Sequence, residues 1–284
     1  MPLTDLVKVI PAEVAEEDEL DIFAFAAGLI FPDDLRNMHG DSGSIIVYKS
    51  ARFGNIELRV ADVVEEDARK RFPQYLWNAS LKMSELISSP PDSRWDVENQ
   101  RVLELGAGTG LAGIVAALAG SRESIISDYP SDEVLDNIRK NTTHALPADT
   151  ATRARVQGYA WGDADSDFAR DNAHSFQRIM AADCFWMPVQ HAHLVKSMLH
   201  MLSLSPEARV LAIAGFHTGR ANLAAFFDEA VAQGLEMEDI YEEDADGVRR
   251  EWLPERDGGF ENHTERKRWL VIAVLKRGQQ TATK

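Results

Sequence analysis

From residue 101 onward, the chain alternates between short apolar runs and longer segments in which apolar residues recur at helical spacing. Short apolar runs are typical of buried strands, and helical spacing is typical of amphipathic helices. We expect strands at residues 102–105, 124–128, 154–160, 178–182 and 210–214. We expect helices at residues 111–119, 132–145, 189–202 and 221–233. Strands that alternate with helices predict an open, mainly parallel α/β sheet.

The pattern changes near the C-terminus. Residues 236–242 and 267–275 both have strand-like patterns, and a polar loop, 243–266, separates them. Two strands joined without a helix are expected to pair as an antiparallel hairpin at the sheet edge. The acidic run 236–246 within this region would form a solvated edge or, alternatively, receive a basic substrate segment.

The first 75 residues do not follow the strand–helix alternation. Residues 44–50 and 56–60 predict two strands of a hairpin, and residues 72–87 predict a helix that Pro90 and Pro91 bring to an end. We therefore divide the chain into an N-terminal extension, 1–90, which would cover the active site, and a core domain, 91–284.

Charge and composition narrow the class of protein. The 46 acidic and 30 basic residues give a net charge of −16, which disfavours direct binding to nucleic acid. An acidic surface either attracts a basic protein or simply aids solubility. The single cysteine, Cys184, rules out an intramolecular disulfide. No signal peptide or membrane span is evident, so we expect a cytoplasmic protein, with the nucleus as a further compartment.

The most informative segment is RVLELGAGTGLAGI, residues 101–114, which runs from a predicted strand through a glycine-rich turn into a predicted helix. Gly106, Gly108 and Gly110 would let the backbone turn tightly and approach a ligand. The alternative is a tight turn without a ligand. No basic residue lies in the turn to hold a pyrophosphate, so the motif favours a nucleoside without phosphates, of which S-adenosylmethionine is the common one.

Two acidic residues strengthen this interpretation. Glu104 ends the first strand among apolar residues, where burial without a partner is costly, so it would face the amino group of the ligand. Asp128 ends the second strand, 18 residues after Gly110, where a carboxylate would accept hydrogen bonds from the ribose hydroxyls. The alternative role for Asp128 is to cap the next helix, although Ser131 suits that role better.

Four motifs resemble the family-16, lysine-type class I methyltransferases over roughly residues 72–277. They are the segment Tyr75–Ala79, the glycine motif Glu104–Gly110, the tryptophan–glycine turn Ala160–Asp163, and the fourth-strand motif Ala182–Trp186. Within the family, the chain is most similar to the fungal group labelled nicotinamide N-methyltransferase-like, which resembles the methyltransferases of elongation factor 1-alpha. The runs GFHTGR (215–220) and ERKRW (265–269) are also similar to that group.

The resemblance implies a seven-strand Rossmann-like sheet that ends in an antiparallel hairpin, and S-adenosylmethionine as the cofactor. Cofactor-binding roles would fall to Trp77, Glu104, Gly106, Gly108, Gly110, Asp128, Tyr129, Trp161 and Asp183. Asp183 and Trp186 would also align the acceptor nitrogen, with His217 at the acceptor rim. Trp186 departs from the family pattern, in which a tyrosine stands at this position. The simpler roles are core packing for the tryptophans and capping for Asp183 and His217.

Methyl transfer from a sulfonium depends on proximity, alignment and a neutral nucleophile more than on a strong acid–base pair. Cys184 beside Phe185 predicts a buried packing residue, and the close pair His191 and His193 predicts no metal site. We expect an N-methyltransferase acting on a protein lysine or N-terminal amine. Two alternatives remain: a small-molecule amine or amide as acceptor, and a non-catalytic subunit with the same fold.

Overall fold

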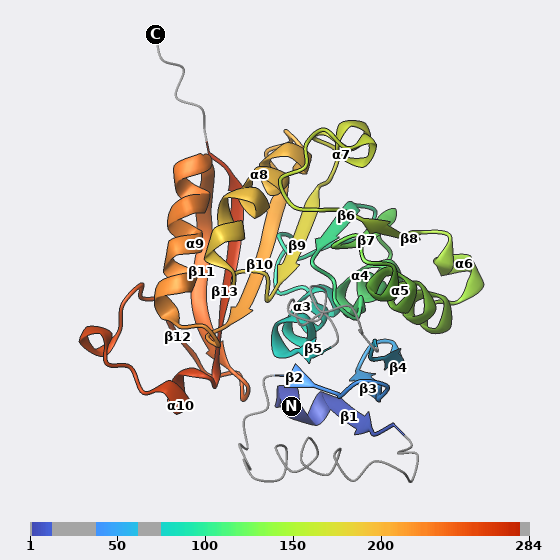
Figure 1. Ribbon diagram of the computed structural model, residues 1–284, viewed down its shortest axis with the longest axis horizontal. Coiled ribbons are helices and arrows are strands. Elements are labelled where there is room, and N and C mark those ends of the chain that lie inside the picture. The colour runs from blue at the N-terminus through green and yellow to red at the C-terminus, as the bar shows by residue number, and fades with distance from the viewer. Residues whose placement is uncertain (1, 13–37, 62–74, 279–284) are drawn as a thin grey trace.

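The computed structural model describes residues 2–12, 38–61 and 75–278. Its main sheet has eight strands in the order β12–β11–β13–β10–β9–β6–β7–β8 (Figure 1). Their bounds are β6 Arg101–Leu105, β7 Glu123–Asp128, β8 Ala154–Gly158, β9 Arg178–Ala182, β10 Arg209–Gly215, β11 Leu235–Asp244, β12 Arg249–Glu251 and β13 Trp269–Arg277. Strands β6 to β10 are parallel, and β13 is antiparallel to both β10 and β11. The predicted α/β fold and its C-terminal antiparallel hairpin are therefore confirmed.

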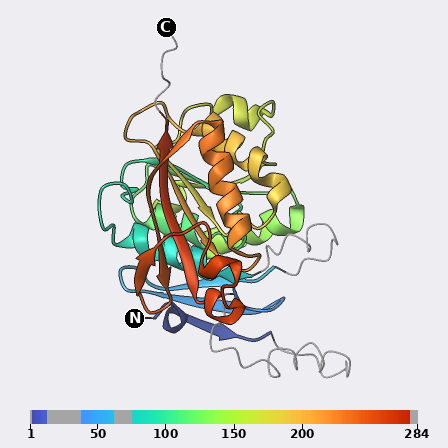
Figure 2. The same cartoon turned by 90° about the vertical axis from the view of Figure 1, so that its left-hand side faces the viewer.

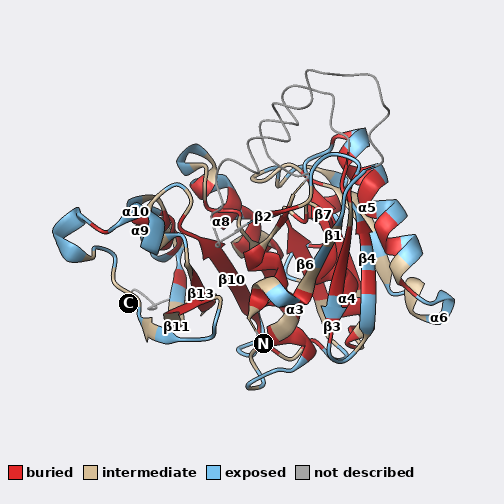
Figure 3. Ribbon diagram, turned by 90° about the horizontal axis from the view of Figure 1, so that it is seen from below, coloured by how far each residue is buried: buried red, intermediate tan, exposed pale blue. Residues whose placement is uncertain are grey.

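Helices cover both faces of this sheet and form two apolar cores. On one face lie α3 (Asn78–Ser88), α4 (Leu111–Leu118) and α5 (Asp132–Ala145). On the other lie α7 (Asp167–Asp171), α8 (His191–Met201) and α9 (Arg220–Gln233). Figure 2 shows α9 against the C-terminal strands, and Figure 3 shows the buried residues concentrated in the sheet and on the helix faces turned toward it. The strands are apolar because both of their faces are buried.

The N-terminal elements lie at the carboxyl ends of the parallel strands (Figure 1). After the 3₁₀ turn η1 (Leu3–Leu6), strands β1 (Val7–Ile10), β3 (Ile45–Ser50) and β4 (Gly54–Arg59) form an antiparallel sheet. The predicted hairpin is thus confirmed as β3–β4. The Asn141 side chain on α5 accepts from the Arg59 N–H at 2.8 Å and donates to the Arg59 carbonyl at 3.0 Å. These bonds attach the small sheet to the core.

The predicted helix 72–87 begins later than expected. Residues 72–74 lie outside the described residues, and Leu76–Trp77 form the short strand β5, paired with β2 (Met38–His39). The His39 ring and the Asn78 side-chain oxygen, 2.8 Å apart, hold this junction, and α3 starts at Asn78. A partner about forty residues away in the sequence therefore overrides the local helical pattern.

Two other predicted segments differ in detail. The helix expected at 189–202 is divided into a 3₁₀ turn, η2 (Pro188–Gln190), and α8. The loop expected at 243–266 contains the end of β11, strand β12, the turn η3 (Asp257–Gly259) and α10 (His263–Arg266). We call residues 245–268 the β11–β13 insertion. It leaves the sheet at the carboxyl end of β11 (Figure 1). A further short helix, α6 (Ala148–Ala151), precedes β8.

Candidate cofactor and acceptor site

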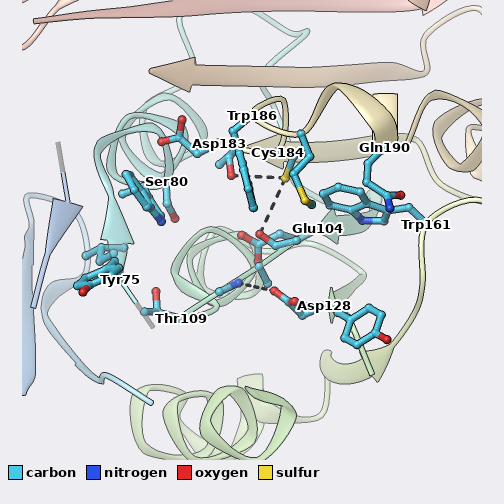
Figure 4. Close-up of a pocket in the computed structure, with 18 of the residues that line it drawn as sticks. Tyr75, Ser80, Glu104, Thr109, Asp128, Trp161, Asp183, Cys184, Trp186 and Gln190 are labelled. Carbon is cyan, nitrogen blue, oxygen red and sulfur yellow. Dashed lines mark hydrogen bonds between the residues drawn. The ribbon is translucent and has the colours of Figure 1, made fainter. Parts of the chain in front are cut away.

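A cavity of about 300 Å³ lies at the carboxyl edge of the parallel strands (Figure 4). Its wall is built by β5 and the start of α3, together with the turns that follow β6, β7, β8, β9 and β10. The wall includes every site residue expected from the sequence except Gly110: Trp77, Glu104, Gly106, Gly108, Asp128, Tyr129, Trp161, Asp183, Trp186 and His217. Open α/β sheets place their ligands at this edge.

The glycine turn allows the backbone to form part of the wall. Gly106 and Gly108 have φ values of +67° and +58°, in the left-handed region that residues with a Cβ rarely adopt. A Cβ on Gly106 would lie 2.8 Å from Cys184 Sγ and 3.0 Å from the Trp161 ring. Gly110 differs, because it lies off the wall as the N-cap of α4, where a Cβ would meet the Ile138 side chain at 3.1 Å. A glycine is therefore needed at position 110 for the left-handed turn and for close packing against Ile138, and not for contact with the cavity.

Glu104 is an acid buried in the cavity wall, only 1% exposed. Its Oε2 accepts a hydrogen bond from the Gly113 N–H at 2.8 Å, in the first turn of α4. Burial raises the pKa of Glu104 to about 8; the nearby Asp128 carboxylate adds to this, and the Gly113 N–H opposes it. A positive charge on a ligand would stabilise the ionised form of this buried carboxyl, so the position favours a cationic ligand.

Asp128 is fixed by two backbone donors. Its Oδ2 accepts from the Gly108 N–H and its Oδ1 from the Tyr129 N–H, each at 2.7 Å. A carboxylate presents two acceptor oxygens, so the group suits a pair of hydroxyls. Asp128 does not cap the following helix, because Ser131 occupies that position.

Aromatic rings line the remaining wall. Figure 4 shows Trp161 beside Cys184 and Gln190, on the opposite side of the cavity from Tyr75. Trp77 lies near Tyr75 with ring centroids 6.2 Å apart, and its ring is 4.8 Å from that of His217. The tryptophans therefore belong to a cavity wall as well as to packing, and they offer flat apolar surfaces to a planar or cationic ligand.

Asp183 and His217 meet where neighbouring strands β9 and β10 end. Asp183 has a left-handed φ of +56°, a conformation often found at functional sites. Its Oδ1 accepts from the Gly215 N–H at 2.7 Å. His217 Nε2 lies 3.2 Å from the same oxygen but outside hydrogen-bonding geometry. The two side chains thus share one end of the cavity.

The expectation for Cys184 agrees with the structure. Its side chain is buried, its Sγ donates to the Leu105 carbonyl at 3.1 Å, and burial raises the pKa of its thiol. A thiol in this state is not a nucleophile. Within the described ranges, no cluster of three or more metal-ligating side chains occurs, and no helix there is long and apolar enough to cross a membrane.

The acidic run 236–246 is not a simple solvated edge. Glu242, Glu243 and Asp244 are buried. Arg220 binds Glu242 through both Nη atoms, with Nη2 at 3.1 Å, and it binds Glu261 at 2.7 and 2.9 Å. Glu243 pairs with Lys82 and Arg249, and Asp244 accepts from the backbone N–H groups of Asp246 and Val248. Because these buried carboxylates already have internal partners, they do not receive a basic substrate segment.

The wall fits S-adenosylmethionine by its donor and acceptor set. A buried acid suits the ligand's amino group, Asp128 suits the ribose, and the glycine turn leaves space that a Cβ on Gly106 would fill. The wall, as the described residues form it, contains no lysine or arginine. A phosphate-bearing nucleotide would therefore lack a cationic partner.

Comparison with known proteins identifies the family. The family model described as lysine methyltransferase matches residues 58–231. The chain belongs to this family. Its match to a putative RNA methyltransferase from Pyrococcus horikoshii has a TM-score of 0.51 at 16% identity, covers 79% of this chain and 92% of that one, and shows the fold alone.

Curated relatives agree with the family assignment. The chain is 32% identical over 177 residues to the protein N-terminal and lysine N-methyltransferase efm7 of Schizosaccharomyces pombe, an alignment that covers 60% of this chain and 67% of the relative. The proteins of the same name in Candida glabrata and Aspergillus fumigatus are 29% and 30% identical. Those alignments cover 58% and 66% of this chain, and 64% and 72% of the relatives. The chain thus spans about two thirds of the length of these relatives. Its family and its relatives identify it as an S-adenosylmethionine-dependent N-methyltransferase.

Proposed function

We propose that the cavity binds S-adenosylmethionine and that the chain transfers its methyl group to a protein amine, either a lysine side chain or an N-terminal α-amino group. The observation that carries this proposal is the division of the cavity wall. Glu104, Asp128 and the glycine turn form a cofactor side, and Asp183, Trp186 and His217 form an acceptor side. The relatives are named as protein N-terminal and lysine N-methyltransferases, which supports a protein acceptor.

Each side chain would have a separate role in binding the cofactor or in positioning the acceptor. Glu104 would bind the amino group of the cofactor, Asp128 its ribose and Trp161 its adenine face. When bound, S-adenosylmethionine would supply a methyl group on a sulfonium; an amine lone pair can attack that methyl carbon and displace the thioether. Asp183 would accept a hydrogen bond from the acceptor nitrogen, and Trp186 would present its ring to a nitrogen carrying positive charge.

The cofactor side is tested by calorimetry with Asp128→Ala. The change removes hydrogen bonds between a carboxylate and the ribose, each worth about 1.5–3 kcal/mol. We therefore expect S-adenosylmethionine affinity to fall by roughly 10- to 100-fold or more. Asp149→Ala is the matched control, because Asp149 is exposed on α6, away from the cavity. Unchanged affinity in Asp128→Ala would remove Asp128 from the binding site.

The acceptor class is tested with methyl-labelled cofactor and a lysate from cells that lack this gene product. Label on a protein band that appears with the wild type and not with Asp128→Ala supports the proposal. Label confined to the small-molecule fraction would favour a small amine instead. Retained cofactor binding with no label in either fraction would favour a non-catalytic subunit. Mass spectrometry of the labelled band would identify a lysine or an N-terminus.

A further inference from the structure

Two buried polar atoms on the acceptor side have no hydrogen-bond partner among the described residues. They are Asp183 Oδ2 and His217 Nε2, and both side chains line the cavity. A buried polar atom left without a partner costs about 1–3 kcal/mol. Native proteins satisfy most such atoms, so an unpaired carboxylate oxygen and ring nitrogen in one cavity indicate a ligand with hydrogen-bond donors.

The backbone holds both side chains in place. The Asp183 N–H donates to the Ile213 carbonyl at 2.8 Å, and the Asp183 carboxylate accepts from the Gly215 N–H. Gly215 also leaves room for the imidazole, because a Cβ at this position would lie 2.4 Å from His217 Nε2. On its other side, the His217 ring contacts Trp77. The pair is therefore built into the ends of β9 and β10.

We propose that His217 accepts the proton that the substrate ammonium must lose before methyl transfer, while Asp183 binds that ammonium and then stabilises the imidazolium. This inference rests on the proposed function. The proton moves from the substrate nitrogen to His217 Nε2 and leaves the nitrogen lone pair free. The nitrogen then forms a bond to the methyl carbon as the carbon–sulfur bond breaks, and that electron pair stays on sulfur. His217 afterwards returns the proton to solvent.

The charges around His217 favour this direction of transfer. Among the described residues, the charged group that forms a close pair with His217 is the Asp183 carboxylate, 3.2 Å away just after β9. From β5 the ring meets the uncharged Trp77, with Tyr75 beside it. From the β11–β13 insertion, Arg266 approaches Gly219, and at the start of α9 Arg220 is paired with two glutamates. In the described part of the chain, the charge beside the ring is thus negative, and a carboxylate in that place can bind the proton-bearing ring once the proton has been transferred.

The test compares pH profiles of kcat/KM for the wild type and His217→Gln, with the methyl-accepting lysate protein as substrate. With a histidine base, the wild-type rate should rise with pH and level off once the imidazole is neutral. His217→Gln should instead rise toward the ordinary pKa of the acceptor, about 8 for an α-amine or about 10 for lysine. At pH 7 its rate should be lower by on the order of 10²-fold. His263→Gln, at an exposed position on α10, is the matched control.

A second measurement does not depend on turnover. The imidazole NMR signals of His217 are assigned by triple-resonance experiments on the wild type and followed as the methyl-accepting protein is added. If the acceptor ammonium meets His217 and Asp183, these signals should move on addition, and Asp183→Asn should weaken that response. His217 signals that do not respond to the acceptor overturn the proposal even if His217→Gln fails to fold.

The outcomes distinguish failure of the proposed function from failure of the proposed role of His217. If the wild type labels no protein, the proposed function fails. If the wild type labels a protein and His217→Gln binds S-adenosylmethionine normally with a wild-type pH profile, only the role of His217 fails. A merely structural histidine would alter folding or cofactor affinity and would leave the shape of the pH profile unchanged.

Discussion

Replacing Glu104 with glutamine distinguishes the effect of the buried carboxylate on folding stability from its proposed role in binding the cofactor. Glutamine has nearly the same shape, and its side-chain carbonyl can still accept from the Gly113 N–H that Oε2 now binds. The substitution removes only the negative charge. In the free protein, that charge is unfavourable, because burial raises the pKa of Glu104 from the ordinary 4.5 to about 8.

The magnitude follows from proton linkage. Because the pKa of the carboxyl is higher in the folded than in the unfolded protein, the stability it contributes is intact below pH 4.5 and is lost progressively up to about pH 8. At pH 7 about 2.5 of those pH units have been crossed, at about 1.4 kcal/mol each. We therefore expect Glu104→Gln to be more stable than the wild type by about 3.5 kcal/mol at pH 7, with no difference near pH 4.5.

The assay is urea denaturation of both cofactor-free proteins between pH 5 and pH 8. Glu98→Gln, an exposed substitution just before β6, is the control and should show no such trend. In the same variant, affinity for S-adenosylmethionine should fall by roughly 10- to 100-fold, because a charge-assisted hydrogen bond is lost. A stability difference between the two proteins that does not change with pH would refute a raised pKa for the buried Glu104 carboxyl.

Three further outcomes are expected. Gly106→Ala should lower the free energy of unfolding by about 1–3 kcal/mol and weaken cofactor binding, because its Cβ meets a side chain at 2.8 Å at a positive φ; denaturation and calorimetry measure both. Arg220→Met should cost about 3 kcal/mol in unfolding, since it leaves buried glutamates without this cation, and adding Glu242→Gln should recover part of the loss. Trp77→Ala should raise KM for the protein acceptor several-fold while changing cofactor affinity less, as steady-state kinetics with calorimetry would show.

The main sheet could be predicted because its strands are buried on both faces and are therefore short apolar runs. The strand expected at 178–182 agrees with β9, and the helix expected at 132–145 agrees with α5. Strand β5 could not be predicted, because its pairing with Met38–His39 depends on a distant segment. The burial of Glu242 on β11 could not be predicted for the same reason, because its partner Arg220 lies 22 residues earlier in the sequence, at the start of α9.

The candidate site divides in the same way. Glu104 and Asp128 could be placed from sequence because they end adjacent parallel strands, β6 and β7, whose carboxyl ends meet at one edge. Gly110 carried the same sequence signal as Gly106, yet it lies off the cavity wall. The difference depends on side-chain neighbours: Cys184 and Trp161 beside Gly106, Ile138 beside Gly110.

The two sides of the cavity therefore differ in how they are built. On the proposed cofactor side, Glu104 and Asp128 lie at the carboxyl ends of the adjacent parallel strands β6 and β7. They bind backbone N–H groups of the glycine turn and of the helix after it. On the proposed acceptor side, the ring of His217, which follows β10, contacts Trp77 of the N-terminal extension. Because the ring of Trp77 contacts that of His217, we expect changes in the packing of the extension to affect the proposed acceptor side more than the hydrogen bonds of Glu104 and Asp128. We therefore expect the extension to influence which amine is accepted more than how the cofactor is bound.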